Sequence, residues 1–306
     1  MSKLFTLIRR EIWEHPAFYV APLVVTAIMV LALAADTLVF GQNILRPTNF
    51  VQFLQMVPDA ARQDVYGILM IMPAFIPYAI VLVFVIFFYL MDCLYAERKD
   101  RSILFWKSLP VSDTETVFSK IATAMFTIPL VTLVVYLVST FGFFVVLTFI
   151  VWAGGGNPWT LLWSAFPVFE VAGLITYSLL VQSFWFLPFI GWVALASAFA
   201  RRMPFLWVVL VPVGVVIVET FLFGTREFIG MIGARIEGVF KLSYTDEDLH
   251  FDFDDMEELQ FENTGSILDV IDPTPLLTST GFWGGLVVGG GLIAAAIWLR
   301  RYRDDS

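Results

Sequence analysis

Six long apolar segments are the feature that most limits what this chain can fold into. An α-helix rises about 1.5 Å per residue, so it needs roughly 20 apolar residues to cross a hydrocarbon core of about 30 Å. The segments that reach this length are residues 17–35, 67–91, 121–152, 171–200, 203–224 and 281–299. The third ends at the turn signal of residues 154–158, Gly-Gly-Gly-Asn-Pro. The sequence therefore predicts an all-α polytopic membrane protein with six transmembrane helices.

The composition supports a lipid environment. Hydrophobic residues make up 59% of the 306 residues and charged residues only 15%, whereas a soluble domain carries about 25% charge. A globular fold of this size cannot hide so many apolar side chains, because much of its surface faces water. We therefore exclude an ordinary soluble enzyme and treat residues 1–306 as one transmembrane domain. The single cysteine, Cys93, excludes an intramolecular disulfide.

Basic residues gather at one set of connections between the six segments. Thirteen of the 18 Lys and Arg residues lie in the N-terminal segment, the connections after the second and fourth segments, and the C-terminal tail. Basic residues close to span ends are retained on the cytoplasmic side of a membrane. We therefore expect both termini to be cytoplasmic and residues 225–280 to be extracytoplasmic.

Residues 225–280 hold the acidic excess of the chain. They contain 13 Asp and Glu against three Lys and Arg, whereas the other 250 residues have a net charge of +1. The overall charge of −9 thus describes one loop and does not indicate a nucleic-acid partner. The region opens with apolar residues at helical spacing, and no calcium-loop spacing follows. A solvated acidic loop is the favoured interpretation, and binding of cations or a basic substrate is the alternative.

The first 15 residues have the pattern of a helix that lies along a membrane surface. Leu4, Phe5, Ile8 and Trp13 recur at helical spacing, while Lys3 and other charged residues occupy the remaining positions. We expect an interfacial amphipathic helix at the inner surface of the membrane.

The connection at residues 92–113 combines charge with aromatic side chains. Three basic residues that could anchor it to anionic lipid are Arg98, Lys99 and Arg101. Residues 103–106, Ile-Leu-Phe-Trp, form an apolar patch that a cytoplasmic partner could bury. Ser112 and Glu115 have the spacing of a capping box, which predicts a new helix leading into the third span.

This connection resembles the permease subunits of ABC-2 type transporters, which have six spans and an amphipathic N-terminal helix. The resemblance is carried by Glu97, Arg98, Asp100, Arg101 and Ser102, followed by Ser-Leu-Pro-Val-Ser at residues 108–112. The small-residue end of the fourth span, followed by Arg201 and Arg202, is similar too, as is the last span with its basic end at residues 300–303. The large acidic region before the last span departs from the family pattern.

The resemblance implies that residues 92–113, here called the coupling segment, contact a separate ATPase subunit. The residues assigned to this contact are Glu97, Arg98, Asp100, Arg101, Ser102, Phe105, Trp106, Leu109 and Pro110. It also implies export or flipping of a hydrophobic or amphipathic substrate across the inner membrane of a bacterium. Two ATPase copies and a second copy or paralogue of this chain would complete the transporter.

No catalytic centre is expected in the chain itself. A phosphate cradle of the form Gly-x-x-x-x-Gly-Lys-Ser/Thr is absent, and so are metalloprotease, serine-hydrolase and dinucleotide-binding motifs. ATP and Mg²⁺ would therefore be bound by the partner ATPase. This chain would be a transport subunit without a cofactor, metal site or enzymatic activity of its own.

Two carboxylates and two glycines within or beside the spans are further candidates. Glu170 and Glu219 lie towards the outer side, where they would form an outer gate or, as ordinary interfacial carboxylates, reach water. Gly285 and Gly289 have the small-x-x-x-small spacing of a helix-packing face, within one chain or between two.

Two other classes of function remain open. An ion-coupled secondary transporter would need carboxylates at the membrane midplane and broken helices in paired halves, and the sequence shows neither clearly. A membrane scaffold or sensor subunit that transports nothing is the other alternative.

Overall fold

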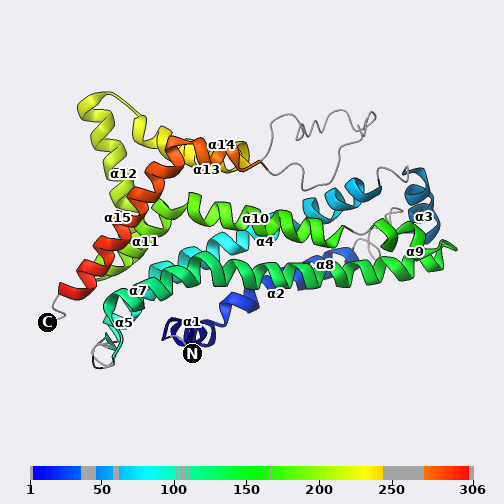
Figure 1. Cartoon of the computed structure of the whole chain (residues 1–306), viewed down its shortest axis with the longest axis horizontal. Helices are drawn as coiled ribbons and strands as arrows, with labels where there is room; N and C mark the ends of the chain where they lie inside the picture. Colours follow the sequence, from blue (N-terminus) through cyan, green and yellow to red (C-terminus); the bar gives the residue numbers. More distant parts are fainter. Residues whose placement is uncertain are drawn as a thin grey trace.

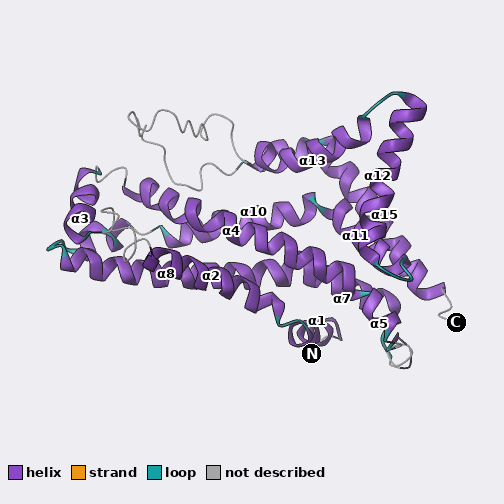
Figure 2. Cartoon of the chain, turned by 180° about the vertical axis from the view of Figure 1, so that it is seen from behind, coloured by secondary structure: helices purple, strands orange, loops and turns teal. Residues whose placement is uncertain are grey.

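The computed structural model describes residues 3–35, 46–57, 62–100, 102–103, 108, 110–165, 167–243 and 272–302. In these residues the regular elements are all helices (Figures 1 and 2). They are α1 (Lys3–Glu14), α2 (Ala17–Ala35), α3 (Pro47–Met56), α4 (Arg62–Cys93), α5 (Tyr95–Lys99), α7 (Asp113–Ala122), η4 (Thr123–Thr127), α8 (Ile128–Ala153), α9 (Pro158–Leu161), η5 (Trp163–Ala165), α10 (Val168–Trp185), α11 (Leu187–Phe199), α12 (Pro204–Phe223), α13 (Glu227–Ser243), α14 (Thr274–Thr278) and α15 (Thr280–Tyr302).

The described chain is an all-α protein with the helices of a multi-pass membrane protein. Five helical stretches are long and apolar enough to cross a membrane, and the number rises to six if α1 and α2 count as one bent span. Large apolar side chains point outward from these helices; Phe221 on α12 and Val287 on α15 are 85% and 76% exposed. Lipid would remove such side chains from water.

α1 and α2 meet at an angle of 49° where Pro16 interrupts the chain. α1 is therefore a separate helix, as the N-terminal pattern predicted. Its Leu7 is buried, whereas Phe5 and Trp13 are exposed. That division leaves apolar side chains available for a membrane surface, and the interfacial position itself stays a prediction.

The third predicted span belongs to one helical stretch of 41 residues, from Asp113 to Ala153. It begins at the predicted capping box: the Glu115 N–H donates to Ser112 Oγ, and the Ser112 N–H donates to a Glu115 carboxylate oxygen. At about 1.5 Å per residue the stretch is about 60 Å long, twice the hydrocarbon thickness. Its far end projects to α3 and α9, where its last residues join their apolar cluster.

The same stretch contains a π-helical turn, η4, just before Pro129. Pro129 has no N–H to donate to the carbonyl of Met125, four residues earlier. The Ser183 hydroxyl of α10 donates to the Met125 carbonyl instead, at 2.7 Å. The local irregularity therefore joins the third span to the fourth.

The fourth predicted span, expected as one helix over 171–200, is broken at Phe186 into α10 and α11. Pro188 cannot donate to the Phe184 carbonyl, and the Phe189 N–H bonds Phe186 instead of Trp185. The break leaves the Trp185 carbonyl without its usual helical partner. Arg235 of α13 supplies a donor to it at 2.9 Å.

The chain reverses between α12 and α13, and α15 then packs along α11. Gly224 ends α12 with a φ of 66°, a conformation that favours glycine. α13 is the helix expected at the start of the acidic region, and it contacts both α10 and α12. The acid-rich part of that region, residues 246–262, lies outside the described residues.

The largest apolar core lies where α4, α7, η4, α11 and α15 meet. Its fully buried members include Leu90, Val117, Ile128, Ala194 and Ala296. This core brings the helices of both termini to one end of the molecule, since α1 and α15 both pack against α7 (Figure 1).

Candidate functional site

Charged side chains from four helices form one ion-paired group at the end where the terminal helices meet. We call this group the terminal charge cluster, and it consists of Arg10 and Glu11 from α1, Glu97 from α5, Asp113 and Lys120 from α7, and Arg300 from α15. Three acids face three bases. The cluster connects the coupling segment to both terminal helices.

Lys120 and Arg300 are the two central cations of the cluster. Lys120 Nζ lies 2.9 Å from Glu11 Oε1 and 3.1 Å from Glu97 Oε1. Arg300 Nη1 donates to Glu97 Oε2 at 2.5 Å, and Arg300 Nε donates to Asp113 Oδ1 at 3.0 Å. Glu97 is thus shared between α7 and α15.

The centre of the cluster is withdrawn from water. Glu11 is 1% exposed and Lys120 3% exposed. Tyr89 of α4 also donates its O–H to Glu11 Oε2 at 2.9 Å, and Arg10 Nη2 lies 2.9 Å from Glu11 Oε1. Burying ions is costly unless each is paired and hydrogen-bonded. The cluster therefore holds its helices in one arrangement through charge complementarity.

The Glu97 carboxylate of the coupling segment is ionised among these partners. Burial acts to raise the pKa of Glu97, but the adjacent Lys120 and Arg300 outweigh it, and the pKa falls below its usual value. Glu97 therefore carries its negative charge at neutral pH, as the pairing requires.

His15, at the junction of α1 and α2, lies beside the cluster. Its Nε2 is 3.6 Å from Glu11 Oε2, yet burial lowers the pKa of His15 below its ordinary value. Glu11, Glu14 and His15 bring three oxygen and nitrogen atoms within 4.8 Å of one another. Lys120 and Arg10 already form ion pairs with the Glu11 carboxylate. This group is therefore better described as part of an ion-pair network than as a metal site.

Arg98 joins the coupling segment to α11. Its Nη2 donates to the carbonyls of Ser197 and Ala200, at 2.6 and 2.9 Å. The backbone N–H groups of Leu94 and Tyr95 donate to Ser197 Oγ. Carbonyls at the end of a helix lack helical partners and attract a cation. The junction of α4 and α5 is therefore fastened to the end of the broken fourth span.

The other residues assigned to the coupling segment have different surroundings. Ser102 Oγ donates to the Glu97 carbonyl, Asp100 is exposed at the end of α5, and Pro110 is exposed with its carbonyl accepting from Lys3 Nζ. Four assigned residues lie outside the described residues: Arg101, Phe105, Trp106 and Leu109.

One part of the sequence interpretation of this segment is wrong. Ile103, expected in an apolar surface patch, is only 2% exposed. Its side chain is buried in the fold itself, so it is not available to a partner. The other three residues of that patch, 104–106, lie outside the described residues.

The two carboxylates considered for an outer gate do not form one group. Glu219 accepts hydrogen bonds from the N–H groups of Glu227 and Phe228 and from the Thr225 hydroxyl. It therefore fastens the turn into α13. Glu170 lies in the first turn of α10, and the start of α10 is well separated from the end of α12 along the molecule's long axis (Figures 1 and 2).

The two glycines of the last span have packing partners within this chain. A Cβ at position 289 would lie 2.7 Å from the backbone carbonyl carbon of Leu187, so only glycine permits this approach of α15 to α11. A Cβ at position 285 would collide with the Arg235 guanidinium. Both small residues thus admit neighbouring elements close to α15.

The sequence reasoning missed most members of the terminal charge cluster. It counted Lys120 only as a basic residue that sets the orientation, noted Arg300 only for orientation and for the basic end of the last span, and did not single out Glu11. A usable signal was the position of Lys120, directly before 49 residues without a charge. A charge at such a boundary needs a partner when it is buried.

Comparison of the chain with family models, with curated proteins and with solved structures finds no match.

Proposed function

We propose that this chain is the membrane-spanning permease subunit of an ABC-2 type transporter. It would export or flip a hydrophobic or amphipathic substrate across a bacterial inner membrane, with both termini in the cytoplasm. The observation that carries the proposal is the attachment of the coupling segment. The consecutive residues Glu97 and Arg98 tie that segment to α7, α11 and α15.

This attachment suits a segment that receives force from a partner. Two ATPase subunits would bind ATP and Mg²⁺ and press on the coupling segment as they close. The ion pairs of Glu97 would pass that displacement to α7 and α15, while Arg98 would pass it to α11. A pathway between this chain and a second copy or paralogue would then alternate between inward-open and outward-open states.

An ion-coupled secondary transporter is the second candidate, because the break between α10 and α11 is a feature that such transporters use. Such transporters use broken helices whose freed carbonyls coordinate a cation. Here the freed Trp185 carbonyl accepts from the Arg235 guanidinium, and a positive charge at that position repels a cation. The Arg235 charge therefore argues against cation binding at this break.

A tryptophan substitution in the coupling segment tests the proposal. Trp106→Ala should reduce co-purification with the ATPase encoded next to this chain and should reduce its stimulated ATP hydrolysis. Trp13→Ala is the matched control, because Trp13 is 74% exposed on α1 and belongs to the same end of the molecule. We expect it to leave both measurements unchanged.

Three results would contradict the proposal. Unchanged ATPase binding and stimulation in Trp106→Ala would remove the coupling role. Substrate movement in vesicles without any nucleotide would favour the ion-coupled transporter. A chain that stimulates no ATP hydrolysis at all would favour the membrane scaffold or sensor.

A further inference from the structure

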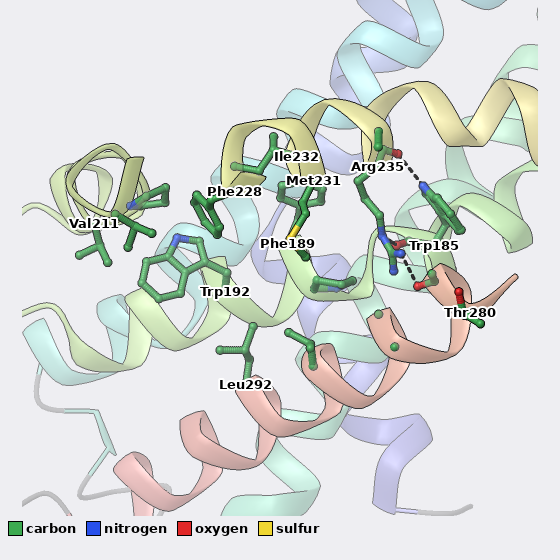
Figure 3. A pocket seen from close by; sticks show the side chains of 18 residues that line it. Trp185, Phe189, Trp192, Val211, Phe228, Met231, Ile232, Arg235, Thr280 and Leu292 are labelled. Carbon is green, nitrogen blue, oxygen red and sulfur yellow. Dashed lines mark hydrogen bonds between the residues drawn. The ribbon is translucent and has the colours of Figure 1, made fainter. Parts of the chain in front are cut away.

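A cavity of about 800 Å³ lies between α11, α12, α13 and α15 (Figure 3). Its walls are aromatic and aliphatic, with Phe189 and Trp192 from α11, Val211 from α12 and Met231 from α13 among the side chains that face it (Figure 3). This size falls within the range of small-molecule sites, about 300–1,000 Å³. An apolar ligand portion of lipid-like size would fit it.

Arg235 is the one charged side chain among the described residues that line this cavity. Its Nε donates to the Trp185 carbonyl at 2.9 Å and its Nη1 to the Gly281 carbonyl at 2.6 Å. The guanidinium carbon lies 4.1 Å from the centre of the Trp185 ring, and the ring's Nε1 donates back to the Arg235 carbonyl. These contacts hold the guanidinium in one place at the broken span (Figure 3).

Within the described residues, nothing neutralises the positive charge of Arg235. Its hydrogen-bond acceptors are backbone carbonyls, no carboxylate of the described chain pairs with it, and its Nη2 has no hydrogen-bond partner there. A cation inside an apolar region is costly when it lacks a counter-charge. Gly285, without a Cβ, leaves the space that the guanidinium occupies. The cavity therefore contains a cation for which the described part of the chain supplies no anion.

We propose that this cavity binds an anionic amphiphile. A carboxylate or phosphate group would pair with the positive charge of the Arg235 guanidinium from the cavity side. The hydrocarbon portion would lie against Trp192 and Phe189. The same chemistry describes an anionic membrane phospholipid and an anionic cargo. Binding of an anionic amphiphile in this cavity does not depend on the proposed transport function. Only the identification of that amphiphile as transported cargo rests on the proposed function.

Quenching of tryptophan fluorescence by brominated acyl chains tests the site. The purified full chain in nanodiscs is titrated with brominated oleate, brominated phosphatidylglycerol and brominated phosphatidylcholine. The difference between the unmodified chain and Trp192→Phe gives the part of the signal that comes from Trp192 in the cavity wall. We expect the two anionic probes to quench that signal at roughly 10-fold to 100-fold lower mole fraction than phosphatidylcholine, the ratio for one charge-assisted hydrogen bond.

Three variants distinguish the effect of the Arg235 charge from the effect of the open volume of the cavity. Arg235→Gln should remove the preference for anionic probes, and Arg235→Lys should retain most of it. Gly284→Leu should block all three probes, because position 284 lines the cavity and a Cβ there meets no other atom within 4 Å. Gly290→Leu is its matched control on the same helix, since position 290 is equally open but lies outside the cavity wall.

Two results would overturn the site. One is an equal response of Arg235→Gln and the unmodified chain to anionic and zwitterionic probes. The other is equal quenching in Gly284→Leu and Gly290→Leu, which decides the matter even if Arg235→Gln fails to fold.

Adding the ATPase with ATP then distinguishes the two sources of ligand. A cargo is released from the cavity when nucleotide is hydrolysed, whereas a resident phospholipid stays bound. An anionic preference that ATP does not change therefore supports the site with a resident lipid as its ligand. If the unmodified chain shows no preference for anionic probes before ATP is added, but still stimulates the ATPase, the site is rejected and the proposed transport function stands.

Discussion

The terminal charge cluster and the Arg235 cavity differ in whether their charged side chains are paired with opposite charges. In the cluster, three acids and three bases neutralise one another, and the central Lys120 contacts two carboxylates. In the cavity, Arg235 binds only carbonyl groups and an aromatic face among the described residues. As far as the described residues show, the charges of the cluster are matched and the charge in the cavity is not.

This difference separates a structural tie from a binding site. A neutral, hydrogen-bonded network gains nothing from an added ion, so its role is to fix the helices that it joins. A cation that has a cavity on one side and no counter-charge gains an electrostatic partner when an anion binds. Under the two proposals, the cluster would transmit displacement and the cavity would bind a ligand.

Replacement of the cluster's lysine should have the largest effect on stability. Lys120→Met leaves Glu11 and Glu97 without a shared cation, and breaking a buried ion pair from one side costs about 3–5 kcal/mol. The free energy of unfolding, measured by SDS titration in detergent micelles, should fall by that amount. Lys99→Met is the control, because Lys99 is exposed and should change stability by less than about 0.5 kcal/mol. Equal free energies of unfolding for the two variants would show that the ion pairs of Lys120 do not stabilise the fold.

The same substitution in the cavity should cost less. Arg235→Met leaves no charge behind, and its cost is the loss of donors to the Trp185 and Gly281 carbonyls, about 1–3 kcal/mol. The same SDS titration measures it. A loss as large as that of Lys120→Met would mean that Arg235 is a structural tie too, and the contrast between the two regions would fail.

Local patterns predicted the helices, whereas contacts distant in sequence could not be read from them. The apolar runs predicted the positions of the spans, and the spacing of Ser112 and Glu115 predicted the capping box that starts α7. The break at Phe186 was missed, because a proline such as Pro188 inside an apolar run permits a kinked or a broken helix equally.

The candidate site was predicted only where its residues are neighbours in the chain. Glu97 and Arg98 were singled out through the coupling segment, but Glu97 pairs with Arg300, 203 positions away. Such a pair depends on how α5, α7 and α15 pack, and no spacing rule encodes that. Arg235 was likewise counted only as a basic residue on the outer side, since its partners come from two other helices.

The smallest effect should come from acidification beside the cluster. Burial lowers the pKa of His15 in the folded chain below the value of about 6.5 that it has when unfolded. The unfolded chain therefore takes up a proton first as the pH falls, so stability is full above about pH 6.5 and decreases below it. The charged groups that face His15 are Glu11, Glu14, Asp92 and Lys120. Unfolding free energies between pH 7.5 and 5.5 should fall more steeply for the unmodified chain than for His15→Gln. Parallel curves would mean that His15 is no more buried in the folded chain than in the unfolded one, and the cluster would be open to water at the junction of α1 and α2.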